Sequence, residues 1–215
     1  MFIWSLIELT KIYLFSTLSE IMRVFNLWIE NPSKYPIPPT LSQGLVWKIA
    51  IRQDPTRAVP ALLNEWHTND STSVKSLCLQ ALATTNNKKL LWDEILPFTF
   101  TTVPPGDMRT MGSGLASHPA GRRVLWAYMK QHWAACVSRL GNPKIVDRFV
   151  RVSLGEFTDV AMIAEYDEFF EGKDTSSFHR SLNSAKDKIR GRAAYRERDG
   201  AELAKWLAEI TDLGR

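Results

Sequence analysis

The chain has 215 residues, a length that suits one domain or a small pair and allows a substantial core. Hydrophobic residues make up 45% and charged residues 23%, which excludes a disordered chain, a collagen and a coiled coil as the main architecture. The formal net charge of +4 comes from residues 109–215, because the first 108 residues carry nine bases and nine acids. Acids and bases alternate in that half, as at residues 196–199, so we expect solvated helix surfaces and no nucleic-acid partner.

Residues 1–28 are rich in Phe, Ile, Leu and Trp, but charged residues interrupt them at Glu8, Lys11, Glu20 and Arg23. No uncharged run there approaches the roughly 18–20 residues that a membrane span needs, and the start lacks the marks of a secretory signal. The two cysteines are too few for a disulfide framework. We therefore expect no membrane span, an intracellular and cytoplasmic location, and a first helix over residues 3–28 that another surface covers.

The rest of the chain shows helical spacing of apolar residues, broken by proline, glycine and asparagine. This spacing predicts helices over residues 41–52, from Pro55, after an N-cap at Ser71, around Leu90 and Ile95, over residues 119–140, 144–153 and 158–170, and after Thr175 with a bend near Gly191. The segment after Met108 is a weaker helix, because Gly112 and Gly114 each disfavour it by about 1 kcal/mol. About ten helices without a strand pattern predict an all-α fold. Periodicity alone leaves open a HEAT- or armadillo-like α-solenoid and a compact bundle.

A search for chemical motifs returns none with a known mechanism. The chain has no His-Glu-x-x-His, no Cys-x-x-Cys, no Gly-x-x-x-x-Gly-Lys and no Gly-x-Ser-x-Gly sequence. We therefore expect no metal site and no cofactor. His132 is expected in the core, and Glu165, Asp167 and Glu168 are expected on a solvated helix face.

Four polar residues remain as candidates for a site. His118 and Arg122 lie at the start of the helix predicted over residues 119–140, where free backbone N–H groups and a cation can receive a carboxylate. His118 and Tyr166 are the candidate acid–base residues, and Arg109 and Arg122 are the candidate ligand-binding residues. Against a ligand role for this helix start, two arginines in the first turn oppose the helix dipole, which costs a few tenths of a kcal/mol unless an anionic group is nearby.

Four segments carry motifs that have one order along the chain. They are Val-Lys-Ser-Leu-Cys-Leu-Gln-Ala-Leu (74–82), Ser-His-Pro-Ala-Gly-Arg-Arg-Val-Leu-Trp-Ala-Tyr-Met-Lys-Gln-His-Trp (117–133), Phe-Thr followed by Glu-Phe-Phe (157–170), and the run from Ile189 through Arg198-Asp199 to Trp206-Leu207. Over roughly residues 40–210 the chain resembles the C-terminal helical domain of M1-family zinc aminopeptidases. The resemblance implies a HEAT-like superhelical bowl over residues 31–215, with the apolar helix of residues 1–30 in the same domain.

In that family, the bowl caps a zinc-bearing domain and encloses the cavity that receives the peptide. The zinc ligands, the Glu base and the exopeptidase loop have no counterpart here, so the resemblance implies that this chain is no aminopeptidase on its own. Two departures are notable: Ser117-His118 stands where relatives often carry a basic residue followed by Asn, and Tyr195 replaces the usual Trp. The first departure puts in question whether this chain shares the capture of a peptide carboxylate that the resemblance would imply.

Three functions remain open at this point. The first is a non-peptidase binding or structural module that takes a peptide. The alternative is a cofactor-free enzyme of the cyclase or isomerase type, recruited to a biosynthetic pathway, with a hydrophobic small molecule in a concave cavity walled by some of the eight tryptophans. The third is a homodimer in which the N-terminal helix covers a partner's apolar stripe.

Overall fold

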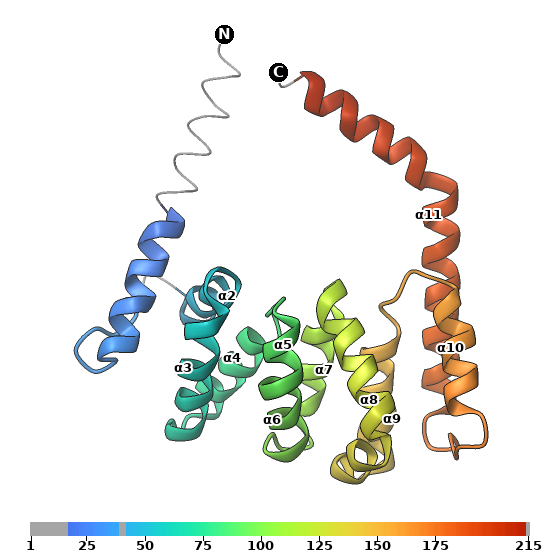
Figure 1. Ribbon diagram of the computed structural model, residues 1–215, viewed down its shortest axis with the longest axis horizontal. Helices are drawn as coiled ribbons and strands as arrows, with labels where there is room; N and C mark the ends of the chain where they lie inside the picture. Colours follow the sequence, from blue (N-terminus) through green and yellow to red (C-terminus); the bar gives the residue numbers. More distant parts are fainter. Residues whose placement is uncertain (1–16, 39–41, 214–215) are drawn as a thin grey trace.

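The computed structural model describes residues 17–38 and 42–213, which form helices joined by short loops, with no strand among them (Figure 1). The first described helix covers residues 17–30. The others are α2 (Gln43–Gln53), α3 (Pro55–Thr68), α4 (Thr72–Leu82), α5 (Lys88–Leu90), the π-helix η1 (Leu91–Ile95), α6 (Leu96–Thr101), α7 (Met108–Ala116), α8 (Pro119–Leu140), α9 (Pro143–Leu154), α10 (Ala161–Phe170) and α11 (His179–Leu213). The predicted all-α fold is confirmed.

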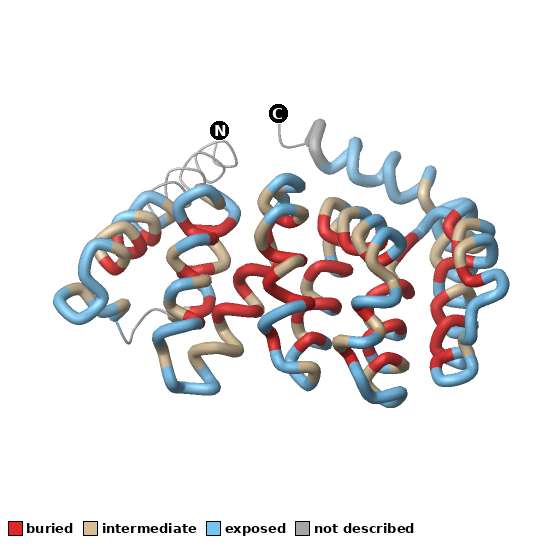
Figure 2. The backbone as a smooth tube through the Cα atoms, turned by 60° about the horizontal axis from the view of Figure 1, so that its bottom comes forward, coloured by how far each residue is buried: buried red, intermediate tan, exposed pale blue. Residues whose placement is uncertain are grey.

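The helices stack side by side from the N-terminal to the C-terminal end (Figure 1). In one series of contacts α2 packs against α4, α4 against α7, α7 against α9, and α9 against α11. In a second series α3 packs against α5, and α5 and α6 pack against α8. Figure 2 shows buried residues on the faces that these helices turn toward one another. Each helix therefore buries its apolar face against its neighbours, as in the predicted α-solenoid.

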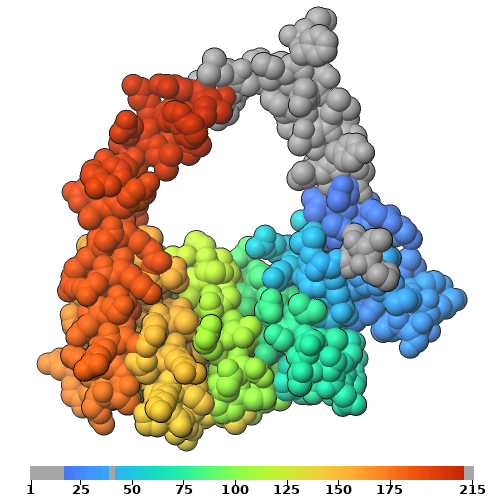
Figure 3. Space-filling model, turned by 180° about the vertical axis from the view of Figure 1, so that it is seen from behind, coloured from blue at the N-terminus to red at the C-terminus, as the bar shows by residue number. Residues whose placement is uncertain are grey.

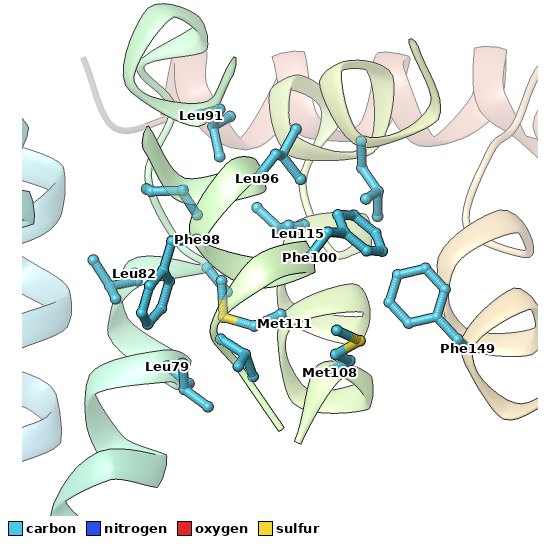
Figure 4. Packing of buried hydrophobic residues seen from close by; sticks show 14 of the residues in the cluster. Leu79, Leu82, Leu91, Leu96, Phe98, Phe100, Met108, Met111, Leu115 and Phe149 are labelled. Carbon is cyan, nitrogen blue, oxygen red and sulfur yellow. The ribbon is translucent and has the colours of Figure 1, made fainter. Parts of the chain in front are cut away.

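Buried side chains of successive helices meet in one continuous core (Figure 4). The labelled members are Leu79 and Leu82 of α4, Leu91 of η1, Leu96, Phe98 and Phe100 of α6, Met108, Met111 and Leu115 of α7, and Phe149 of α9. Full burial of one such side chain stabilises the fold by roughly 1.5–3 kcal/mol. Helices as short as α5 and α6 therefore depend on packing more than on their own propensity.

The N-terminal helix shares this core. Its buried residues are Ile21, Val24, Phe25 and Trp28, and the Trp28 ring lies 5.3 Å from the ring of Trp47 in α2, centroid to centroid. The helix ends at residue 30, before the Asn-Pro sequence that was predicted to stop it. The part of the predicted helix before residue 17 lies outside the described residues.

The helix predicted around Leu90 contains a π-helical turn that the sequence pattern did not indicate. The N–H of Leu96 donates to the carbonyl of Leu91, five residues earlier. Pro97 follows directly, and a proline ring in a regular α-helix clashes with the carbonyl four residues before it, here that of Asp93. The wider turn relieves this conflict, so the chain stays helical through Pro97.

The long helix predicted over residues 119–140 is present as α8, with one departure. The backbone at His132 has φ −120° and ψ 26°, which is not helical, and so the helix is kinked there. The end of α8 agrees with the prediction: Gly141 has φ +67°, a value that favours glycine, and its N–H donates to the carbonyl of Val137. The start of the helix predicted over residues 158–170 differs slightly, since α10 begins at Ala161.

The last helix, α11, has two parts with different surroundings. Its first part packs against α9 and buries Leu182, Ala185 and Ile189. Its second part changes direction and projects from the row of helices (Figure 3). There Leu203 and Trp206 are 46% and 54% exposed. The predicted bend is therefore present in the ribbon, and the apolar residues that follow it lie on an exposed face.

Candidate functional site

An open pocket of about 440 Å³ lies between α2, α4 and α7. Three basic side chains line it: Lys48 and Arg52 from α2, and Arg109 from α7. Its other lining residues are uncharged, namely Gln80, Thr84, Thr110, Ser113, Gly114 and Ser117. The wall of this basic pocket therefore carries three positive charges, no negative charge and several hydroxyl groups.

The pattern of α2 explains how two of the bases reach the pocket. Trp47 and Ile51 are fully buried, so α2 turns its apolar face to the core, while Lys48 and Arg52, four residues apart, share the adjoining face. Like charges at this spacing disfavour a helix by about 0.2–0.5 kcal/mol. Within the described residues, none of the three lining bases forms an ion pair. A bound anion would offset their repulsion and accept their hydrogen bonds.

His118 lies beside the pocket and joins two helices. Its Nδ1 accepts the N–H of Gly121 at 3.1 Å, which caps the start of α8, and its Nε2 lies 3.0 Å from the carbonyl oxygen of Ala83 at the end of α4. Since Nδ1 accepts, Nε2 carries the proton and donates to Ala83. Burial lowers the pKa of His118, and the positive charges of Arg122 and Arg52 act in the same direction. Both ring nitrogens are engaged in this arrangement, and the acid–base role stays a prediction.

Arg122 turns away from the basic pocket, toward the loop after α9. Its guanidinium donates to the carbonyl oxygens of Glu156 and Ser117. Arg192 of α11 donates to the Glu156 carboxylate at 2.8 Å and to the carbonyl oxygen of Gly155. One arginine from α8 and one from α11 therefore both bind this loop. The structure does not bring Arg122 into the pocket that Arg109 lines.

Tyr166 lies in the core, fully buried, and belongs to none of the cavities described here. Its hydroxyl donates to the carbonyl oxygen of Leu154 at 3.0 Å. The ring packs edge-on against Trp126, with centroids 4.8 Å apart. Burial raises the pKa of Tyr166, with the negative charge of Glu165 adding to this effect. These contacts join α10 to α8 and α9, and the predicted catalytic role of Tyr166 stays a prediction.

The solvated face predicted for three acids of α10 is confirmed only in part for Glu165, whose side chain is 36% exposed and also binds α8. Trp126 of α8 donates its indole N–H to Glu165 Oε1 at 2.8 Å, and Lys130 donates to the same oxygen. Burial opposes ionisation of Glu165, but the hydrogen bonds from Lys130 and Trp126 outweigh it and lower its pKa. Asp167 and Glu168 are exposed, as expected. Glu165 therefore fastens α10 to α8.

Sequence reasoning named Arg109 but missed its two partners in the basic pocket. One signal was present: Lys48 and Arg52 lie four residues apart on the polar side of the helix predicted over residues 41–52. This spacing indicates a basic pocket only once the tertiary structure is known, because α2 and α7 both pack against α4 and so bring Arg109 to the same pocket as Lys48 and Arg52.

Two further properties concern the described residues as a whole. Among them, no three His, Cys, Asp or Glu side chains gather in a way that would hold a metal ion. No helix in residues 17–38 and 42–213 combines the length and the apolar character of a membrane span.

The stacked helices form an all-α, solenoid-like domain with a basic pocket between α2, α4 and α7. Residues 13–191 match the family model of the ERAP1-like C-terminal domain. The chain therefore belongs to the ERAP1-like C-terminal domain family, and the resemblance to the C-terminal domain of M1 aminopeptidases is confirmed.

Curated relatives agree with this assignment. The chain is 28% identical to the alanine/arginine aminopeptidase of Saccharomyces cerevisiae over 83% of its own length and 21% of that protein. It is 26% identical to aminopeptidase M1-B of Oryza sativa subsp. japonica, over 95% of its own length and 24% of that protein. A third relative, aminopeptidase 2, mitochondrial, of Saccharomyces cerevisiae is 30% identical over 65% of the chain and 15% of that protein. The chain thus spans less than a quarter of the length of each of these relatives.

Proposed function

We propose that this chain is a binding module that does not cleave peptides by itself and that receives the C-terminal carboxylate of a peptide in the basic pocket. The observation that carries the proposal is a set of three bases, Lys48, Arg52 and Arg109, that form no ion pair with any described residue and lie in a pocket without an acidic lining residue. A carboxylate accepts paired hydrogen bonds from a guanidinium, and charge-assisted bonds of this kind are among the stronger ones in proteins.

The relatives support a peptide as the class of ligand, since their names describe aminopeptidases. The absence of His-Glu-x-x-His from the sequence supports a role without hydrolysis. The departure from the family pattern at Ser117-His118 is compatible with the proposal, because Lys48 and Arg52 reach the pocket from α2 and not from this segment. His118 and Arg122 then act as structural residues beside the pocket.

Binding of a fluorescent peptide with a free C-terminal carboxylate, compared with its C-terminal amide, tests the proposal. We expect the carboxylate form to bind about tenfold more tightly or better, a difference of about 1.4 kcal/mol. The variant Arg52→Gln/Arg109→Gln should lose this preference. A matched control, Arg57→Gln/Lys88→Gln, removes two exposed bases outside the pocket and should keep it. Equal binding of carboxylate and amide by the unmodified protein would refute the proposal.

A second experiment addresses the absence of peptidase activity. The purified chain is incubated with an aminoacyl arylamide, with and without added zinc. We expect no arylamine above the uncatalysed rate, because the sequence lacks the residue pattern that binds catalytic zinc. Release of arylamine with stoichiometric bound zinc would contradict this part of the proposal.

The alternative, a cofactor-free cyclase or isomerase for a hydrophobic small molecule, requires an enclosed apolar cavity. The basic pocket between α2, α4 and α7 is instead open and is lined mainly by charged and hydroxyl side chains. This lining favours the binding module. The predicted homodimer through the N-terminal helix and the intracellular location stay predictions.

A further inference from the structure

A second basic cavity lies at the other end of the stack, where α9 and α11 begin. Its volume is about 690 Å³, a size that accommodates a small organic ligand. The charged residues that line it are Lys144, Asp147, Arg148, Arg151 and Arg180, and Ser176, Ser177 and His179 add polar groups. We name it the α9–α11 cavity. It shares no residue with the basic pocket between α2, α4 and α7.

Positive charge is in excess around this cavity. Its one acidic lining residue, Asp147, is paired with Arg151 at 2.8 Å. Lys144, Arg148 and Arg180 form no ion pair within the described part of the chain. Three positive charges from two facing helices therefore remain without a counter-charge around one cavity.

Some other bases in the same half of the chain are paired with acids. Arg190 binds Asp187 at 2.7 Å, and Arg192 binds Glu156 at 2.8 Å. The three unpaired bases of the α9–α11 cavity differ from these in lying around one cavity without such a partner among the described residues. Lys144 and Arg148 lie four residues apart on α9, so they repel one another unless an anion lies between them.

The backbone at the start of α11 adds donors of the same kind. The N–H groups of residues 179–181 form the first turn of α11, and within the described residues they donate to no backbone carbonyl. They add partial positive charge at the end of the cavity that Arg180 lines. The hydroxyl of Ser177 supplies a further donor nearby, whereas that of Ser176 is hydrogen-bonded to Asp174.

We infer that the α9–α11 cavity binds a small organic polyphosphate. Lys144, Arg148 and Arg180 are joined here by the N–H groups at the start of α11, and two or more phosphate groups match this charge and accept hydrogen bonds from guanidinium, ammonium, hydroxyl and amide donors. The cavity is larger than one phosphate group requires, so the ligand carries its phosphate groups on a larger framework. The site is independent of the peptide pocket proposed above.

Calorimetric titration with sodium tripolyphosphate tests this inference. We expect binding that weakens with added salt, and about tenfold weaker binding to the variant Arg148→Gln/Arg180→Gln. A matched control, Arg196→Gln/Lys205→Gln, removes two exposed bases of α11 outside the cavity and should change the affinity by less than about twofold. All four side chains are exposed, so circular dichroism and the unfolding temperature should stay near those of the unmodified protein.

Several outcomes would overturn the inference. These are no binding of tripolyphosphate, equal weakening in both double variants, which would indicate attraction by net charge alone, and tighter binding of a phosphoserine peptide than of tripolyphosphate at the same arginines. The variant Arg52→Gln/Arg109→Gln separates the two proposals, because it should bind tripolyphosphate normally while it loses the preference for a peptide carboxylate.

Discussion

Gly114 of α7 and Ala83 at the end of α4 approach so closely that no side chain fits between them. A Cβ atom on Gly114 would lie 2.5 Å from the Cβ atom of Ala83, a separation that real Cβ atoms essentially never show. The glycine that weakens α7 as an isolated helix is therefore the residue that allows α7 to pack against α4. The same contact forms one side of the basic pocket, which Gly114 lines.

We predict that Gly114→Ala destabilises the protein by about 1–3 kcal/mol, even though alanine favours a helix by about 1 kcal/mol. Gly191→Ala is the matched control, because a Cβ there meets nothing within 4 Å in the middle of α11. That variant should be stabilised by up to about 1 kcal/mol. Urea unfolding of both variants measures the two effects. A stabilised Gly114→Ala protein would mean that α4 and α7 are not in close contact.

We predict that the protein loses stability as the pH falls below about 6.5, the ordinary pKa of histidine. The folded state lowers the pKa of His118, so between its lowered value and 6.5 the unfolded chain binds a proton that the folded chain does not. The stability that this difference in pKa contributes is fully present above pH 6.5. It is lost as the pH falls through the lower pKa that His118 has in the folded protein. Urea midpoints at about pH 7.5 and about pH 5.5 measure the difference.

The variant His118→Asn is the control for this pH dependence. Asparagine can still accept a hydrogen bond at the start of α8, but it does not titrate and loses the donor to Ala83. It should lower the free energy of unfolding by about 1 kcal/mol at neutral pH and reduce the difference between the two pH values. An unchanged pH difference would assign the titration to another group.

We predict that Tyr166→Phe lowers the free energy of unfolding by about 1 kcal/mol without changing peptide binding. It removes the hydroxyl that donates to the buried carbonyl of Leu154, while the ring contacts with Trp126 remain. Tyr128→Phe is the comparison, since the Tyr128 hydroxyl has no hydrogen bond among the described residues, and it should be near neutral. Loss of ligand binding in Tyr166→Phe at unchanged stability would favour a direct role for Tyr166.

We predict that both cysteines are unreactive in the folded protein. Burial raises the pKa of the Cys78 and Cys136 thiols to about 12, so the thiolate fraction near neutral pH is very small. Reaction with a thiol reagent at about pH 8 should be more than about a hundredfold slower than after unfolding in guanidinium, where both thiols react. Rapid labelling of either thiol in the native protein would show that its helix opens readily.

Helix ends were predictable where the signal lies within a few residues of chain. Ser71 accepts the N–H of Val74 at 3.4 Å at the start of α4, and Gly141 ends α8, as the sequence pattern indicated. Capping involves neighbours in the chain, so it leaves a local signature. The π-turn before Pro97 was not predicted, because a proline can either end a helix or be accommodated by a wider turn. The kink at His132 was not predicted, because no proline or glycine near it in the sequence marks one.

The all-α class and the approximate helix bounds follow from periodicity, since an apolar face must repeat every three or four residues to be buried. The candidate site depends on contacts between distant residues. Glu165 binds Trp126, and Arg109 lines the same pocket as the bases of α2, only because the helices between them stack in one order. Periodicity identifies the face of a helix that is buried but not the helix that covers it. Side-chain packing across the stack decides which helices become neighbours. It therefore also decides where positive charges from different helices come together.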